Sequence, residues 1–487
     1  MTERPEARSP KGFVDKRAAD IAAERTIVDA VSAVYERYGF EPLATSAFEY
    51  VDVLGKFLPD EDRPNEGVFA LKDDDEQWIA LRYDLTAPLA RFVAENAQTI
   101  PRPFRRYAVG AVWRNEKPGP GRNREFVQCD ADTVGSARPE ADAEMIAMMA
   151  EGLEAAGVPA GQALVKINSR KLLNGLLSSA GVADERQRLR VLRAVDKLDR
   201  LGVGGVAQLL GPGRKDESGD FTKGAGLSAP ASERVLAFVG AGAGGRRETL
   251  DRLANVIGGS AEGDAGLADL DRIHQALTGL GFDESRAVFD PSVVRGLEYY
   301  TGAVFEAELL TPTLDERGQP VRFGSVGGGG RYDDLIARFT GETVPATGGS
   351  FGVTRLAAAL KAAGRAEALR PRGPVVVIAF EAEAMDDYFA MARELRSAGL
   401  AAEVYLGESG MRAQMRYADR RLSPAAVIVG GDERAAGQVT IKDLDLGREL
   451  AAGVADNKTW RDERPGQITV PRADLVAAVR RIVDAGR

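Results

Sequence analysis

Apolar residues near the N-terminus recur at the spacing of an α-helix. The recurrence runs from residue 17 to residue 38 and predicts an amphipathic helix that ends at Gly39. The next predicted elements are a strand at 41–48, a hairpin at 69–71 and 78–81 across an acidic turn, and a helix at 86–96 with Thr86 as its N-cap. This part of the chain therefore mixes helices with strands.

Two longer strands are predicted at 105–112 and 124–134, joined by a loop over residues 115–123. The second strand alternates apolar residues with a second set that shares one face: Phe126, Gln128, Asp130 and Asp132. Such a face is typical of the solvated side of an antiparallel sheet. Arg114 and Glu116 follow the first strand, and their charges favour the other interpretation, a polar cavity.

The middle of the chain has a different composition. Residues 170–260 are rich in alanine, leucine, glycine and charged residues at helical spacing, and they predict a helical insertion. Strands are predicted again at 300–310 and 321–326, and Gly327–Gly330 follow the second strand. Four glycines in a row fit either a flexible turn or a close approach of the backbone.

A glycine- and proline-containing stretch at 364–374 precedes a region in which strands and helices alternate. The predicted strands are 375–380, 401–406, 425–429 and 439–441, and the predicted helices are 385–397, 411–422 and 470–485. Such alternation is typical of an α/β domain with a mostly parallel sheet.

Composition and charge narrow the classes of protein. The 487 residues are 44% hydrophobic and 28% charged, which predicts a folded chain of several domains, and the net charge of −9 argues against a protein that coats nucleic acid. The single cysteine, Cys129, excludes a disulfide framework, and the single histidine, His274, excludes a multi-histidine metal site. With no signal peptide and no long apolar run, a cytoplasmic protein without membrane spans is expected.

Four segments resemble one known family. Arg114–Glu116 with Gly121–Phe126 resembles motif 2 of the class II aminoacyl-tRNA synthetases, and Gly348–Arg355 resembles motif 3. Arg295–Gly302 and Gly328–Asp333 are similar to the histidine-specific segments of histidyl-tRNA synthetases. The stretch Thr45–Glu49 departs from the family because it has no motif 1 proline, and Asp84 replaces a glutamate found in many bacterial relatives.

The resemblance implies a fold and a domain order. The fold is α/β, with an α+β catalytic domain built on the antiparallel sheet of class II synthetases. The implied order is a catalytic core at 1–169, a helical insertion at 170–260, the rest of the core at 261–366 and an α/β anticodon-binding domain at 373–487.

The resemblance also implies a reaction and its partners. Histidyl-tRNA synthetases join L-histidine to ATP as histidyl-adenylate and then transfer the histidine to tRNA(His), with Mg²⁺ accompanying ATP and with a homodimer as the working form. The nucleophile of the first step is the carboxylate of histidine, which is ionised at pH 7 and needs no general base. A chain with one histidine and no triad is compatible with this chemistry.

Residue roles follow from the same resemblance. ATP would be bound by five residues: Arg114 at the α-phosphate, Glu116 and Phe126 at the adenine, Arg122 at the outer phosphates and Arg355 at the γ-phosphate. Arg295 would be the catalytic cation, together with Arg114. Histidine would be bound by Asp84, Thr86 and Gln128 at its ammonium and by Asp132 and Tyr300 at its imidazole. Arg295 and Tyr299 are also expected to bind histidine. Asp130 is assigned no role.

Two other functions remain to be distinguished. One is the non-catalytic, histidyl-synthetase-like regulatory subunit of ATP phosphoribosyltransferase, which generally lacks an anticodon-binding tail. The other is a class II synthetase for a different amino acid, such as proline or threonine, which the segment Arg295–Gly302 disfavours. In the tail, six polar residues are candidates to face an anticodon stem, although each alone is more often solvated: Arg412, Gln414, Arg416, Arg420, Arg421 and Lys442.

Overall fold

The computed structural model divides the chain into two compact units, Met1–Leu369 and Arg370–Arg487. The described residues are 4–54, 67–119, 122–215, 219–242, 244–257, 259–294, 300–311, 313–314, 320–321, 324–365, 372–451 and 466–485. Each unit has its own hydrophobic core.

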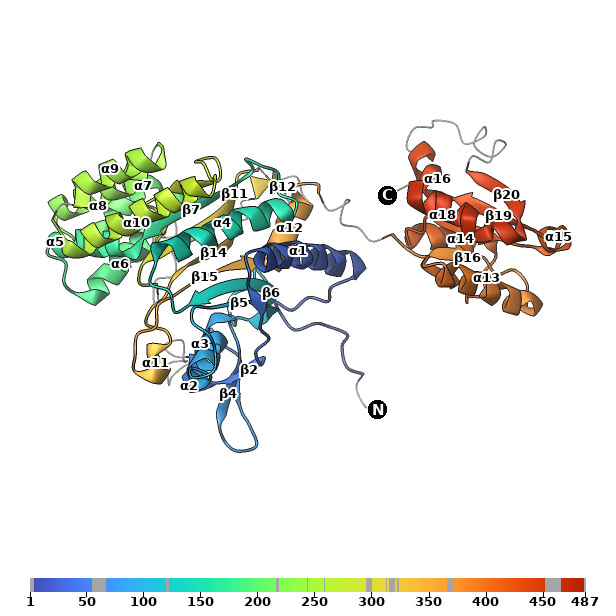
Figure 1. Cartoon of the computed structure of the whole chain (residues 1–487), viewed down its shortest axis with the longest axis horizontal. Coiled ribbons are helices and arrows are strands. Elements are labelled where there is room, and N and C mark those ends of the chain that lie inside the picture. The colour runs from blue at the N-terminus through green and yellow to red at the C-terminus, as the bar shows by residue number, and fades with distance from the viewer. Residues whose placement is uncertain are drawn as a thin grey trace. The chain divides into compact units, whose positions relative to one another are not determined.

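An eight-stranded sheet forms the centre of the first unit, in the order β1-β5-β6-β15-β14-β11-β7-β10 (Figure 1). Its strands are β1 (Glu41–Pro42), β5 (Phe104–Trp113), β6 (Glu125–Val134), β7 (Ala163–Ser169), β10 (Ala287–Phe289), β11 (Ala303–Leu309), β14 (Ser325–Arg331) and β15 (Ala346–Gly352). The outer pairs β1·β5 and β7·β10 are parallel, and the five pairs between them are antiparallel. The prediction of an antiparallel catalytic core is therefore confirmed.

Three helices contribute to the core beside the central strands: α1 (Ala18–Arg37), α4 (Pro139–Ala155) and α12 (Val353–Ala362). Helix α4 lies close to β15, because a Cβ atom on Gly152 would stand 2.8 Å from the Phe351 ring. The apolar residues of β6, such as Cys129 and Ala131, point into this core. The alternation of a strand therefore sends Gln128, Asp130 and Asp132 to the opposite face.

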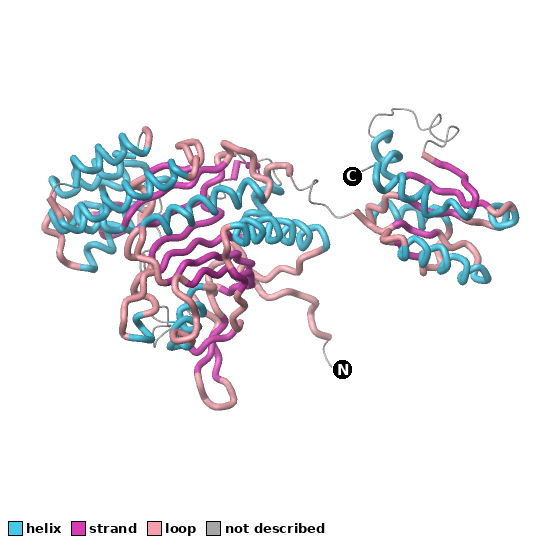
Figure 2. The backbone as a smooth tube through the Cα atoms, in the orientation of Figure 1, coloured by secondary structure: helices cyan, strands magenta, loops and turns pink. Residues whose placement is uncertain are grey.

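A group of helices gathers beside β7 (Figures 1 and 2). Its members are α5 (Arg170–Ser179), α6 (Glu185–Val195), α7 (Leu198–Leu210), α8 (Ala229–Val239), α9 (Arg246–Ile257) and α10 (Ala261–Gly279), with a small hairpin of β8 (Gly213–Lys215) and β9 (Phe221–Lys223). His274 lies on α10, where its Nδ1 atom accepts a hydrogen bond from Arg246 Nε at 3.2 Å. Burial and the Arg246 charge lower the pKa of His274, so its surroundings are those of a structural contact.

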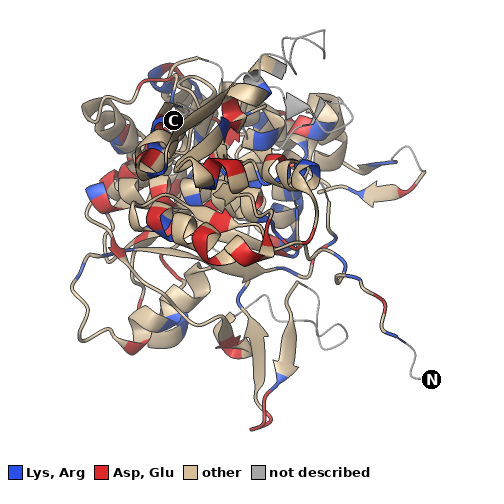
Figure 3. Ribbon diagram, turned by 90° about the vertical axis from the view of Figure 1, so that its right-hand side faces the viewer, with Lys and Arg blue, Asp and Glu red and all other residues tan. Residues whose placement is uncertain are grey.

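A small three-stranded sheet contains β2 (Phe48–Tyr50), β4 (Trp78–Leu81) and β3 (Ala70–Lys72), and it accompanies α2 (Val51–Leu54), α3 (Thr86–Glu95) and α11 (Ala337–Thr340). The hairpin prediction is confirmed, with its acidic turn at the tip (Figure 3). The predicted strand 41–48 is wrong, because β1 and β2 belong to different sheets. The predicted cap is also wrong, because Asp84 Oδ1 accepts from the Thr86 and Ala87 N–H groups.

The second unit has a five-stranded sheet in the order β17-β16-β18-β19-β20. Its elements are β16 (Val375–Val377), α13 (Met385–Ser397), β17 (Ala402–Val404), α14 (Met411–Arg420), β18 (Ala425–Ile428), α15 (Gly431–Ala435), β19 (Gln438–Asp443), α16 (Leu444–Ala451), β20 (Gln467–Pro471) and α18 (Leu475–Ala485). The prediction of a mostly parallel sheet is wrong, since β19 and β20 pair antiparallel.

Gln414 on α14 is buried and does not face solvent. Its amide donates to the carbonyls of Ala379 and Ser409 and accepts from the Ala379 N–H. The side chain therefore holds the chain that follows β16, and it is not available to an anticodon stem.

Candidate active site

A cavity of about 500 Å³ lies over the polar face of β6. Ten residues predicted to bind the substrates line it: Asp84, Thr86, Arg114, Glu116, Arg122, Phe126, Gln128, Asp132, Tyr300 and Arg355. They come from distant parts of the sequence, and the sheet brings them together. The other two predicted residues, Arg295 and Tyr299, lie outside the described residues. The cavity interpretation of the β6 face is therefore confirmed over the solvated one.

The floor of the cavity includes glycines of β14 and β15. Gly348 stands opposite Asp132, and a Cβ atom on Gly348 would lie 2.0 Å from Asp132 Oδ1. A Cβ atom on Gly329 would lie 2.1 Å from the Gly348 carbonyl oxygen. The turn interpretation of Gly327–Gly330 is thus wrong, as is the end of the predicted strand at residue 326, because all four glycines belong to β14.

Asp132 is held by two buried residues. Its Oδ2 atom lies 2.8 Å from Arg106 Nη2, and its Oδ1 atom accepts a hydrogen bond from the Tyr332 hydroxyl. Arg106 also donates to the Leu85 carbonyl at 2.9 Å. Burial raises the pKa of Asp132, and the Arg106 charge opposes that rise. Arg106 and Tyr332 were not predicted as site residues, although Arg106 shares the face of β5 that leads to Gly110.

Asp84 and Arg114 both form hydrogen bonds with the backbone near the N-terminus of α3. The backbone N–H groups of Thr86 and Ala87 donate to Asp84 Oδ1 at 3.2 and 3.0 Å. Burial nevertheless raises the pKa of Asp84. Arg114 Nε donates to the Tyr83 carbonyl at 3.1 Å, and the guanidinium carbon lies 5.2 Å from the centre of the Phe126 ring. The aromatic ring and the cation are therefore arranged together at the cavity wall.

Asp130 also lines the cavity, between Gln128 and Asp132. It is 2% exposed, and burial raises its pKa to about 7. Gln128 Nε2 donates to Ser350 Oγ at 3.0 Å, and Ser350 hydrogen-bonds to Asp130. Asp130 was not predicted as a site residue, although its position on the polar face of β6 was a signal.

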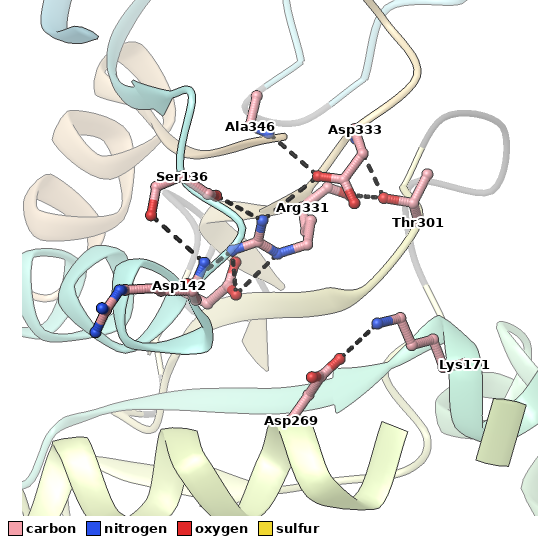
Figure 4. Close-up of polar contacts among 9 residues, drawn as sticks. Ser136, Asp142, Lys171, Asp269, Thr301, Arg331, Asp333 and Ala346 are labelled. Carbon is pink, nitrogen blue, oxygen red and sulfur yellow. Dashed lines mark hydrogen bonds and ion pairs between the residues drawn. The ribbon is translucent and has the colours of Figure 1, made fainter. Parts of the chain in front are cut away.

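Arg331 organises the chain at the end of β14 (Figure 4). Its Nε and Nη2 atoms donate to Asp142 Oδ2 at 3.0 and 2.7 Å. Asp333, two residues later, accepts from the Ala346 N–H at 3.1 Å and donates its own N–H to Thr301 Oγ1 at 3.2 Å. Thr301 follows Tyr300, so this network ties the cavity residue Tyr300 to α4 and β15.

Comparison with known proteins identifies the family. The family model described as "Histidyl-tRNA synthetase" matches residues 12–356, and the one described as "Anticodon binding domain" matches residues 374–482. The chain belongs to the histidyl-tRNA synthetase family. The motif-based resemblance is thereby confirmed.

Relatives of this histidyl-tRNA synthetase family member match over almost their full length. A histidine–tRNA ligase of Caulobacter vibrioides is 69% identical, with 99% of this chain and 97% of the relative covered. One from Cereibacter sphaeroides is 56% identical, with 98% of each covered. The crystal structure of a Nostoc histidyl-tRNA synthetase superposes with a TM-score of 0.74 at 29% identity, covering 98% of this chain and 100% of that one.

These matches establish the activity. The chain is a histidine–tRNA ligase, an ATP-dependent enzyme of tRNA aminoacylation. The regulatory-subunit alternative is not favoured. In the part of the chain that the structure describes, no helix is long and apolar enough to cross a membrane.

Proposed function

We propose that the cavity over β6 is where histidine and ATP react to form histidyl-adenylate. The observation that carries the proposal is the convergence of ten residues from separate segments on one cavity of about 500 Å³. Cationic and aromatic side chains suit the nucleotide, whereas buried carboxylates suit the amino acid.

The nucleotide end of the cavity is formed by Arg114, Arg122, Glu116, Phe126 and Arg355. The bond from Arg114 Nε to the Tyr83 carbonyl orients its guanidinium plane, which suits two oxygens of the α-phosphate. Phe126 stacks on adenine, and Glu116 accepts a hydrogen bond from the adenine amino group. Arg122 and Arg355 bind the outer phosphates.

Mg²⁺ accompanies the phosphates in this proposal. Among the described residues, no cluster of three or more His, Cys, Asp or Glu side chains could hold a metal ion. Mg²⁺ keeps several waters and binds substrate phosphates, so a site rich in arginine fits a metal that arrives with ATP. The ion supplies charge neutralisation at the phosphates, and the arginines orient them.

The amino-acid end of the cavity is lined by carboxylates. Asp84, Thr86 and Gln128 receive the histidine ammonium, and Asp132 with Tyr300 receives the imidazole. Arg106 and Tyr332 are positioning residues, because they hold both oxygens of Asp132 and leave its carboxylate one orientation. A site of buried polar groups rejects other amino acids by about 10⁴–10⁵ when their side chains leave those groups unpaired.

The first step needs charge stabilisation more than proton transfer. A carboxylate oxygen of histidine attacks the α-phosphorus of ATP, the bond to the β-phosphate oxygen breaks, and pyrophosphate leaves. The terminal ribose hydroxyl of tRNA(His) then attacks the histidyl carbonyl carbon and AMP leaves. Arg114 and Arg295 act as the catalytic cations, and Arg295 and Tyr299 contribute to histidine binding.

A homodimer is the proposed working form, in the cytoplasm, where tRNA is charged. Support for the dimer comes from apolar side chains around the small sheet: Phe48 is 42%, Tyr50 54% and Trp78 46% exposed. Phe48, Tyr50 and Phe339 line a shallow groove at the stretch that corresponds to motif 1. A second copy would remove this apolar surface from water.

The proposal is tested by exchange of pyrophosphate into ATP with each of the twenty amino acids, followed by charging of tRNA(His). Exchange with histidine alone is expected. Exchange that depends on another amino acid, or on none, would contradict the proposed site. Sedimentation of the purified chain tests the dimer.

A further inference from the structure

We propose that Asp130 is a further histidine ligand, whose carboxylate receives the ammonium group of the substrate. The inference rests on the proposed placement of histidine over β6. Asp130 stands between Gln128 and Asp132 on the cavity face, and its neighbours across the sheet are Ala108 and Ser350. Both neighbours are small, and Asp130 is among the residues that line the cavity.

One oxygen of Asp130 has no hydrogen-bond partner among the described residues. This atom is Oδ1, and the side chain as a whole is 2% exposed. Buried polar atoms are nearly always satisfied by protein, water or a ligand. Because Asp130 also lines the cavity, a ligand with a donor can supply the missing partner.

The two buried arginines near Asp130 are bound elsewhere. Arg106 pairs with Asp132 at 2.8 Å and donates to the Leu85 carbonyl. Arg82 donates to the carbonyls of Ala111, Thr45 and Ser46. Their charges act on Asp130 from a distance, but neither forms an ion pair with it among the described contacts. The carboxylate is therefore placed to receive a cation from outside the protein.

The ammonium is the cation that histidine brings at neutral pH. Its imidazole is largely neutral there and already has Asp132, which Tyr332 holds in place, as its acceptor. The raised pKa of Asp130 supports the same assignment, since burying this carboxylate works against the fold unless a ligand compensates.

Two analogues of histidine test the contacts of its ammonium and of its imidazole separately. Histidinol keeps the ammonium and the imidazole, whereas imidazolepropionate keeps the imidazole and lacks the ammonium. Binding of each is measured by calorimetry with the full-length enzyme and with Asp130→Asn. Loss of a hydrogen bond to a charged group predicts about 10- to 100-fold weaker histidinol binding, and the affinity for imidazolepropionate is expected to change less than about twofold.

The control variant is Asp132→Asn, which is expected to weaken both probes because both contain the imidazole. Asp130→Ser provides a second variant should the asparagine distort the strand. Equal losses for both probes in the Asp130 variants would place this carboxylate at the imidazole, and unchanged binding would make it structural; either result overturns the inference. If the wild-type enzyme bound neither probe, the proposed histidine site itself would be wrong, and the inference with it.

Discussion

Arg331 and Asp142 form a buried ion pair, with Arg331 Nη2 2.7 Å from Asp142 Oδ2. Arg331 is the last residue of β14, and Asp142 lies in the first turn of α4. The pair therefore joins the sheet under the cavity to α4, which packs on the apolar face of that sheet. Arg331 Nη1 also donates to the Ser136 carbonyl at 2.9 Å. The pair thus holds the end of β14, and the next residue, Tyr332, donates its hydroxyl to Asp132.

Replacement of Asp142 with alanine should destabilise the first unit by about 3 kcal/mol, because the buried Arg331 charge loses its closer partner and keeps only the longer pair with Asp333 Oδ1 at 3.4 Å. Urea unfolding at pH 7.5 measures the change. The control is Glu144→Ala, whose pair with Arg105 has both side chains 30% exposed and should contribute about 0–1 kcal/mol. Similar losses in the two variants would contradict the assigned importance of the buried pair.

Tyr332→Phe removes the hydroxyl that donates to Asp132. The apparent KM for histidine should rise about tenfold or more while the KM for ATP stays within about twofold, since a hydrogen bond to a charged group is lost at the amino-acid end alone. Pyrophosphate exchange measures both constants. Tyr35→Phe is the matched control, because Tyr35 donates to the Cys129 carbonyl on the other face of β6. A parallel rise in both KM values would argue for general damage to the cavity.

Arg295→Ala should lose adenylate formation by about 10²–10³-fold while each substrate still binds, if its cation acts on the redistributed charge of the transition state. Arg295→Lys should recover little, because an ammonium does not reproduce the planar guanidinium. Rapid-quench measurement at saturating substrates follows adenylate formation, and calorimetry follows binding. A defect that higher ATP concentration restores would assign Arg295 to ATP binding.

Asp130→Asn should make the ligand-free enzyme more stable at pH 8 and change its stability little near pH 4. Burial raises the folded-state pKa of Asp130 to about 7 from the ordinary value of 3.8. Between these values the folded state holds more protons than the unfolded state, so wild-type stability falls as pH rises from about 4 to 7. Asp130→Asn has no carboxyl group at this position, so its stability does not fall in this way as pH rises. Thermal unfolding across this pH range checks the sign, and a variant less stable at pH 8 would contradict it.

Deletion of residues 373–487 should leave adenylate formation largely intact and weaken tRNA charging. The ten cavity residues all precede this segment, and the two units have separate cores. Histidine-dependent exchange and tRNA charging are compared in the truncated and full-length proteins. Equal charging by both would argue against anticodon binding by the second unit.

The periodicity of apolar residues correctly predicted the face of a strand on which a side chain lies. It did not predict the direction in which strands pair. The alternation of β6 correctly separated Cys129 from Gln128, because side chains of a strand alternate whatever strand lies beside it. The same local pattern carries no information on strand direction, and the antiparallel β19 was therefore predicted within a mostly parallel sheet. Arg106 was missed because its partner Asp132 is revealed by the register of β5 against β6.

The glycines of β14 and β15 bear on attempts to change the amino acid that the enzyme accepts. A side chain that is already absent cannot be shortened, so substitution at Gly348 or Gly328 can remove volume from the site but cannot add any. A variant that accepts a bulkier histidine analogue must therefore have smaller residues elsewhere in the cavity wall, which includes Gln128 and Tyr332. These residues carry the proposed polar contacts, and room for a larger substrate would come with weaker discrimination against other amino acids.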